Sequence, residues 1–235
     1  MNYLDRDLVD LGAECQDDAQ TSMEVLARRA EQLFRQLATA PADDPGLRAR
    51  LLTELSRTEV SMDRTSDAWG HAMEAFRIQL AREDWEQAVV ACDALFSCGT
   101  DEALIALGHG LWLGITFPID PSLTVRQLMH IIDETPAESD GAAVAAAVAA
   151  YVVELRSEGN QHSELSLAVG QLLNDVARRH GDVRGPEAFK DWFSRLELDD
   201  PAKFLVRMRN VIDVLVQDQW WIDRDALQAT LPPEH

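Results

Sequence analysis

A histidine stands between two glycines at Gly108-His109-Gly110, inside a segment whose apolar spacing predicts a helix. An imidazole can transfer protons near neutral pH or contact a ligand. Each glycine inside a helix costs about 1 kcal/mol relative to alanine, so a compensating contact is expected. Two explanations stay open. Either another helix crosses closely and leaves His109 partly buried, or the missing side chains expose His109 to a ligand.

Tryptophans supply the second group of candidate residues. Trp112 follows on the same predicted helix, and Trp220-Trp221-Ile222 places apolar rings on more than one side of the chain. One core-facing stripe would not bury both rings, and tryptophan is enriched at binding hot spots. A tryptophan near the end of a domain can equally cover the core. The candidate ligand or interface residues are therefore Gly108, His109, Gly110, Trp112, Trp220 and Trp221.

The sequence contains no motif for a metal, a cofactor or a nucleophile. A diiron bundle needs Glu-x-x-His pairs, and no histidine here follows a carboxylate by three residues. Cys92 and Cys98 have no second pair, so we expect buried thiols rather than zinc ligands. Nucleophile elbows, phosphate loops and dinucleotide fingerprints are also missing. We therefore predict no catalytic residue, no metal and no cofactor, and favour a protein that is not an enzyme.

The charge of the chain limits its partners. The 235 residues include 41 acids and 21 bases, which gives a net charge of −20. Direct binding to DNA, RNA or an anionic membrane is disfavoured, because it depends on clustered positive charge. Residues 67 to 135 are poorest in cations, with 11 acids and 3 bases. The expected partner is a neutral or basic protein.

Cysteine usage and the hydropathy pattern favour a cytoplasmic protein. The three cysteines make an odd count that does not suit a disulfide framework. The N-terminus lacks the charged and apolar sections of a secretory signal, and no apolar run is long enough to span a bilayer. Arginine outnumbers lysine 19 to 2, which we interpret as the coding bias of a GC-rich, bacterial genome.

Apolar residues recur at three-to-four spacing along most of the chain, and no segment alternates with a period of two. The sequence therefore predicts an all-α fold of about ten helices, as a multi-helix bundle or a short stack of antiparallel hairpins. The loop from Thr135 to Gly141 divides an N-terminal helical region (1–135) from a C-terminal one (136–235), unless both form one continuous domain. Expected helix starts are Thr21 with Glu24, Ser66, Asp84, Thr100, Thr124 with Gln127, Ser163, Pro186 and Pro201.

One section locally resembles the helices of a tetratricopeptide unit. Asp84 to Val89, followed by Ala103 to Gly108 and Leu111, matches parts of that loose pattern. The helix before Asp84 lacks the expected Leu-Gly pair, and Ile115 to Pro121 interrupts the pattern. No family is assigned on this basis, and the alternative of a degenerate repeat stays open.

Three functional hypotheses follow. The leading one is a non-enzymatic acidic adaptor, accessory factor or chaperone that binds a protein partner. The second is a small-ligand-binding protein or enzyme with an interhelical pocket near His109. The third is an acidic nucleic-acid mimic that occupies a basic groove of another protein. The oligomeric state is left undetermined.

Overall fold

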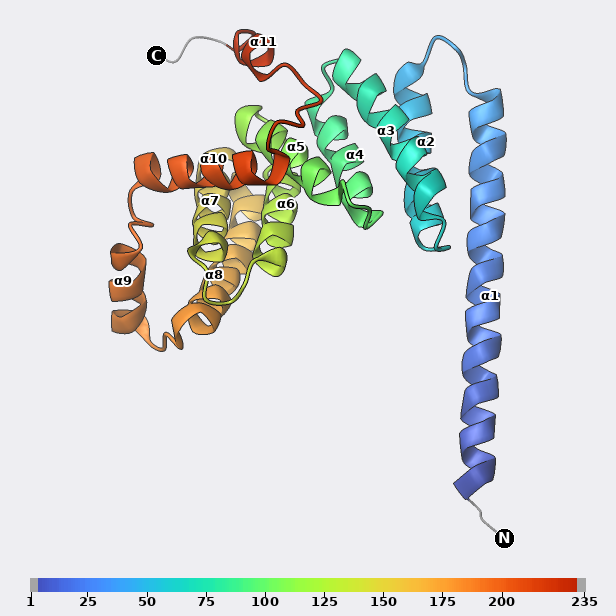
Figure 1. The fold of residues 1–235 in the computed structure, drawn as a ribbon, viewed down its shortest axis with the longest axis horizontal. Helices are drawn as coiled ribbons and strands as arrows, with labels where there is room; N and C mark the ends of the chain where they lie inside the picture. The colour runs from blue at the N-terminus through green and yellow to red at the C-terminus, as the bar shows by residue number, and fades with distance from the viewer. Residues whose placement is uncertain (1–3, 232–235) are drawn as a thin grey trace.

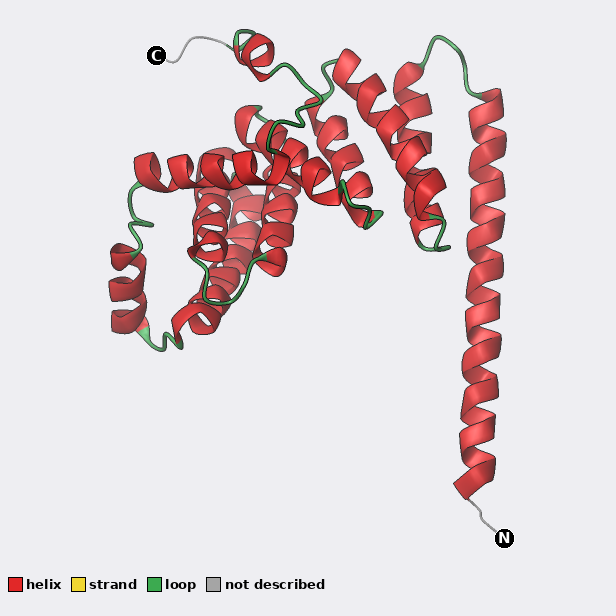
Figure 2. Ribbon diagram, viewed as in Figure 1, coloured by secondary structure: helices red, strands yellow, loops and turns green. Residues whose placement is uncertain are grey.

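The predicted all-α class is confirmed. The computed structural model describes the backbone of residues 4–231 and the side chains of residues 22–231, and this part of the chain contains helices and no strand (Figure 2). The helices are α1 (Leu4–Thr39), α2 (Pro45–Val60), α3 (Thr65–Ala81), α4 (Trp85–Ser97), α5 (Ala103–Thr116), α6 (Pro121–Glu134), α7 (Asp140–Arg156), α8 (Gly159–Gly181), α9 (Pro186–Arg195), α10 (Pro201–Val216) and α11 (Arg224–Gln228).

Short loops bring consecutive helices side by side (Figure 1). From α1 to α8 each helix packs on the next, because a short connection favours an antiparallel neighbour. The exception is α10, which returns to lie across α5 and α7. The segment after α10 then runs back towards α3, so the C-terminal part of the chain meets the N-terminal hairpins.

Two apolar clusters hold these helices together. A small one lies between α1 and α2 and contains Ala30, Leu33, Leu51 and Leu55. A large one extends from Ala49 to Ile222 and includes residues on both sides of position 135. In α7 a run of buried alanines and valines lets α6, α8 and α10 approach closely, because the side chains are small. The division into two regions at residue 135 stays a prediction.

Several helix boundaries match the expected signals. The Asp84 carboxylate accepts a hydrogen bond from the Gln87 backbone N–H at 3.2 Å and caps α4. Pro186 and Pro201 are the first residues of α9 and α10. Gly99 follows α4 with a φ of +64°, a conformation that a residue without a Cβ adopts readily.

The capping box predicted at Thr21 and Glu24 is wrong as a helix start, because α1 runs unbroken from Leu4 to Thr39. No glycine or proline occurs between residues 13 and 40, so nothing in this segment stops a helix that has formed. The side chains of residues 4–21, including Cys15, lie outside the described residues.

The second capping box, at Thr124 and Gln127, is also wrong. Helix α6 begins at Pro121, where the carboxylate of Asp120 accepts a hydrogen bond from the Ser122 backbone N–H at 2.8 Å. Thr124 and Gln127 are buried inside the helix and bind other helices instead. The predicted caps Ser66, Thr100 and Ser163 likewise do not cap the helices that begin at Thr65, Ala103 and Gly159.

Close helix crossings account for the glycines of α5. A Cβ at position 108 would collide with Val216 of α10, and one at position 110 would lie 2.7 Å from Gln127 Oε1. At position 114 it would lie 3.0 Å from Thr124 Oγ1. Each glycine therefore lets α6 or α10 pack against the backbone of α5, and these contacts offset the helix-propensity cost.

Replacing Gly108 with alanine is expected to lower the free energy of unfolding by about 2 kcal/mol, because buried Val216 cannot move without shifting α10. Gly70→Ala is the matched control. Nothing lies within 4 Å of its added methyl group, so the control should gain up to about 1 kcal/mol of helix propensity. Urea unfolding measures both changes, and equal effects would contradict the crossing.

Three arginines tie the end of one helix to another element by donating to backbone carbonyls. Arg156 of α7 binds the carbonyl oxygens of Gly114, Ile115 and Phe117 at 2.6–3.0 Å, at the C-terminus of α5. Arg179 of α8 donates to Ile132 near the end of α6, at 2.7 Å. Arg207 of α10 donates to Leu196 just after α9, at 2.6 Å. Cations at helix C-termini also interact favourably with the helix dipole.

Candidate functional site

The structure brings four of the six candidate residues into one aromatic cluster. The His109 and Trp221 rings stack with centroids 4.3 Å apart, and Trp220 lies 5.0 Å from His109. Trp112 lies 6.2 Å from Trp220 in an edge-on arrangement. On the other side, Trp221 contacts Trp69 and Phe76 of α3 edge-on, at 6.1 and 5.9 Å. The cluster therefore joins α5, α3 and the segment that follows α10.

His109 is fully buried, and both of its ring nitrogens are engaged. Nδ1 donates to the Ile105 carbonyl oxygen at 2.8 Å, and Nε2 accepts the backbone N–H of Trp221 at 2.8 Å. Burial lowers the pKa of His109 to about 4; the hydrogen bond to Ile105 opposes this shift, and the charge of Arg224 adds to it. The neutral ring therefore holds Trp221 in place.

A sharp turn after α10 allows the two tryptophans to reach the cluster. Gln217 ends α10 with φ +52° and ψ −126°, a backbone conformation that normally favours glycine. Ile222 is buried beyond the turn, and the Arg224 guanidinium lies 4.0 Å from the centre of the Trp220 ring. The contacts of Trp220, Trp221 and Ile222 compensate for the strained turn.

An apolar groove runs beside the cluster along α3. It encloses about 390 Å³ and is lined by Trp69, Met73, Phe76, Arg77, Leu80, Glu102 and Trp221. A second, shallower hollow continues it over the exposed face of α3 and shares Trp69, Met73 and Arg77 with it. Trp221 thus forms one wall of a groove whose other wall is α3.

A smaller cavity of about 290 Å³ lies beside Trp112. Trp112 forms its apolar part, and the rest of its lining is polar: Arg209, Asp213, Arg224, Asp225 and Gln228. Arg224 donates to Asp213 at 2.9 Å across this cavity. His109 does not line either of these two spaces.

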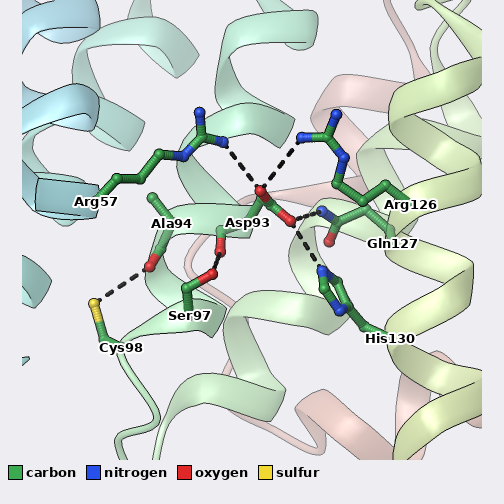
Figure 3. A network of polar contacts seen from close by, with 8 residues as sticks. All are labelled: Arg57, Asp93, Ala94, Ser97, Cys98, Arg126, Gln127 and His130. Carbon is green, nitrogen blue, oxygen red and sulfur yellow. Dashed lines mark hydrogen bonds and ion pairs between the residues drawn. The ribbon is translucent and has the colours of Figure 1, made fainter. Parts of the chain in front are cut away.

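A buried carboxylate that sequence reasoning missed lies at the junction of α2, α4 and α6 (Figure 3). Oδ2 of Asp93 faces Arg57 at 3.0 Å and Arg126 at 3.7 Å. Oδ1 accepts hydrogen bonds from Gln127 at 3.3 Å and from His130 at 3.0 Å. Four side chains from two neighbouring helices therefore meet one carboxylate of α4.

The charge of Asp93 is stabilised despite its burial. Burial by itself would raise the pKa of Asp93, but the hydrogen bond from His130 and the charges of Arg57 and Arg126 outweigh it, so the pKa lies below its usual value. Both carboxylate oxygens are already engaged, and no nucleophile is bonded to His130 among the described contacts. The network is therefore best explained as a structural link between hairpins.

Asp93→Asn is expected to lower the free energy of unfolding by about 2 kcal/mol, because Arg57, Arg126 and His130 lose their shared anion. The control is Glu74→Gln, which removes the half-exposed ion pair with Arg48 and should cost less than about 0.5 kcal/mol. Denaturant unfolding at neutral pH measures the free energy of unfolding of both variants. A smaller loss at position 93 than at position 74 would show that the network does not tie the hairpins together.

One feature of the sequence indicates that Asp93 is buried: it lies in an otherwise apolar stretch of helix. It lies among Cys92, Ala94 and Leu95, all of them completely buried, so a charge at this position requires partners. Nothing in the sequence marks Arg57, Arg126 and His130 as the partners of Asp93, because exposed cations on amphipathic helices are common. Their meeting depends on how α2 and α6 pack on α4.

Within the described side chains, no group of three or more His, Cys, Asp or Glu residues is arranged to hold a metal ion. Both described cysteines, Cys92 and Cys98, are free and buried. No helix among residues 4–231 combines the length and hydropathy that a membrane span requires.

Comparisons with protein-family models, curated proteins and solved structures gave no match to this chain.

Proposed function

We propose that the protein is a non-enzymatic helical adaptor or accessory factor that binds a protein partner in the groove between α3 and Trp221. The observation that carries the proposal is the groove itself, with Trp69, Met73 and Leu80 on one side and Trp221 on the other. Half-buried tryptophans at a solvent-facing hollow are the kind of side chain that contributes most to protein binding.

The surrounding structure supports binding rather than catalysis. The histidine of the cluster is buried, and both of its ring nitrogens are engaged: Nδ1 by the Ile105 carbonyl oxygen and Nε2 by the backbone N–H of Trp221. The groove is lined mainly by apolar side chains, and a helix laid into such a groove is a recurring mode of protein recognition.

A matched pair of variants tests the proposal. Met73 lines both parts of the groove, whereas Met129 is 45% exposed on α6 and lines neither. Met73→Glu is expected to abolish recovery of a stoichiometric partner in a pull-down from the cells that make this protein, while Met129→Glu retains it. Loss in both variants, or in neither, would contradict docking at α3, and absence of any stoichiometric partner for the wild-type protein would remove the adaptor proposal.

Small-ligand binding is the second candidate, supported by the polar cavity beside Trp112. Arg209, Arg224, Asp213 and Asp225 line this cavity together, so a small molecule with both charged and hydrogen-bonding groups would find complementary side chains. A metabolite panel would be screened by thermal shift. A ligand of this cavity must lose its stabilising effect in Arg209→Ala, and an unchanged shift would exclude the cavity. The nucleic-acid-mimic hypothesis stays a prediction.

A further inference from the structure

We infer that the partner segment is a basic amphipathic helix of about three turns, which lays its apolar face along α3 against Trp221. This inference rests on the proposed function and names the chemistry of its partner. The apolar part of the groove runs from Trp69 to Leu80, eleven residue steps along α3. At a rise of 1.5 Å per residue this length is about 17 Å, which matches three turns of a second helix.

The side chains of the groove fit the apolar face of a helix. Trp69, Met73, Phe76 and Leu80 follow one another at intervals of three and four residues, so they form a continuous stripe along α3. Gly70 lies beside this stripe, and a Cβ added there would meet no atom within 4 Å, which leaves room for a residue of the partner. Met73 is flexible and adapts its shape to a bound side chain.

The charge of this region selects a basic helix. Glu102 lines the groove and Glu74 lines the adjoining hollow, and Arg77 is the basic residue that lines both. Glu74 is already paired with Arg48 of α2 at 2.8 Å, so the negative charge offered to a partner comes from Glu102 and its neighbour Asp101. Over residues 67 to 135 the balance is 11 acids to 3 bases. Asp101 and Glu102 are exposed at the start of α5, beside the groove. Lysines or arginines on the flanks of the bound helix would meet these carboxylates and accelerate association.

The probe is a fluorescent 14-residue peptide of leucine and lysine, with leucines spaced to form one face of a helix. Two peptides accompany it: one with every lysine replaced by glutamate, and one with the same composition but the leucines distributed around the helix. Fluorescence anisotropy is expected to show binding of the amphipathic lysine peptide at least ten times tighter than either of the others. Equal binding of the scrambled peptide would overturn the inference, since charge attraction alone would then explain it. Equal or tighter binding of the glutamate peptide would overturn the inference that the partner helix is basic.

Paired protein variants locate the binding. Gly70→Gln adds a side chain to the second part of the groove, and Gly170→Gln makes the same change in α8; at both positions an added Cβ meets no atom within 4 Å. The first variant is expected to weaken binding of the lysine peptide at least tenfold, and the second to leave it unchanged. Met73→Glu and Met129→Glu form a second pair with equal added charge. Equal affinities within both pairs would place the peptide elsewhere and overturn the inference.

Different results would reject the adaptor proposal and the inference of a basic helical partner. A cellular partner that is lost in Met73→Glu, combined with no selective binding of the lysine peptide, would keep the adaptor and reject the basic helix. No cellular partner at all would reject the adaptor, whatever the peptide does.

Discussion

Arg156→Ala is expected to lower the free energy of unfolding by about 4 kcal/mol, because three hydrogen bonds from a charged donor disappear together. The guanidinium is half-buried, and burial lowers the pKa of Arg156 from its ordinary value. Without it, the carbonyl oxygens of Ile115 and Phe117 at the end of α5 lose a donor in a place that water reaches poorly. Urea unfolding followed by circular dichroism measures the change.

Arg156→Lys tests how much of the stabilisation by Arg156 comes from the shape of its guanidinium and how much from its charge. An ammonium group keeps the positive charge but lacks the planar fork that reaches Gly114, Ile115 and Phe117 at once, so we expect about half of the loss. Arg178→Ala is the surface control. Its guanidinium is paired with Asp175 and its side chain is 63% exposed, so the change should cost less than about 0.5 kcal/mol. A loss at position 156 no greater than at position 178 would show that Arg156 does not hold α5 and α7 together.

His109 makes the stability of the fold depend on pH. The pKa of its imidazole is lowered from 6.5 to about 4 in the folded chain. Above pH 6.5 the ring is neutral in both states, and its contribution to stability is complete. As the pH falls from 6.5 to 4, the unfolded chain binds a proton that the folded chain does not, so stability is lost, by about 3 kcal/mol in total.

The variant His109→Gln tests whether His109 causes this pH dependence of stability. An amide oxygen can accept the backbone N–H of Trp221 in place of Nε2, but the side chain does not titrate. The variant is therefore expected to be less stable than the wild type at pH 7, with a difference that narrows by about 3 kcal/mol as the pH falls to 4. Chemical unfolding at a series of pH values gives both curves. Parallel curves would show that His109 is not the titrating group.

The helical class of this protein could be predicted because its apolar periodicity is continuous. Proline and aspartate signals also placed the starts of α4, α9 and α10 correctly. Serine and threonine were less informative. Thr124 looks like a cap in the sequence but is buried, and its hydroxyl donates to the Gly114 carbonyl oxygen of α5. A hydroxyl can satisfy a helix end or a neighbouring helix, and only the tertiary packing decides which.

Residue type drew attention to part of the aromatic cluster, but neither its arrangement nor the groove beside it could be predicted from the sequence. His109, Trp112, Trp220 and Trp221 attracted attention by residue type, and the structure places their rings together. The groove depends on Trp69 and Met73 of α3, which in the sequence resemble any core-facing stripe. Their role arises because the chain returns after Gln217 and lays Trp221 beside them. That return spans more than 100 residues and leaves no local pattern in the sequence.

The central claim is that the exposed face of α3 beside Trp221 contacts a protein partner. A photo-crosslinking amino acid at position 70, compared with the same residue at position 170, tests this claim in the cells that make the protein, since both sites are open and lie within helices. We predict a discrete adduct of one partner from position 70 and none from position 170. The same adducts from both positions, or none from position 70, would contradict it.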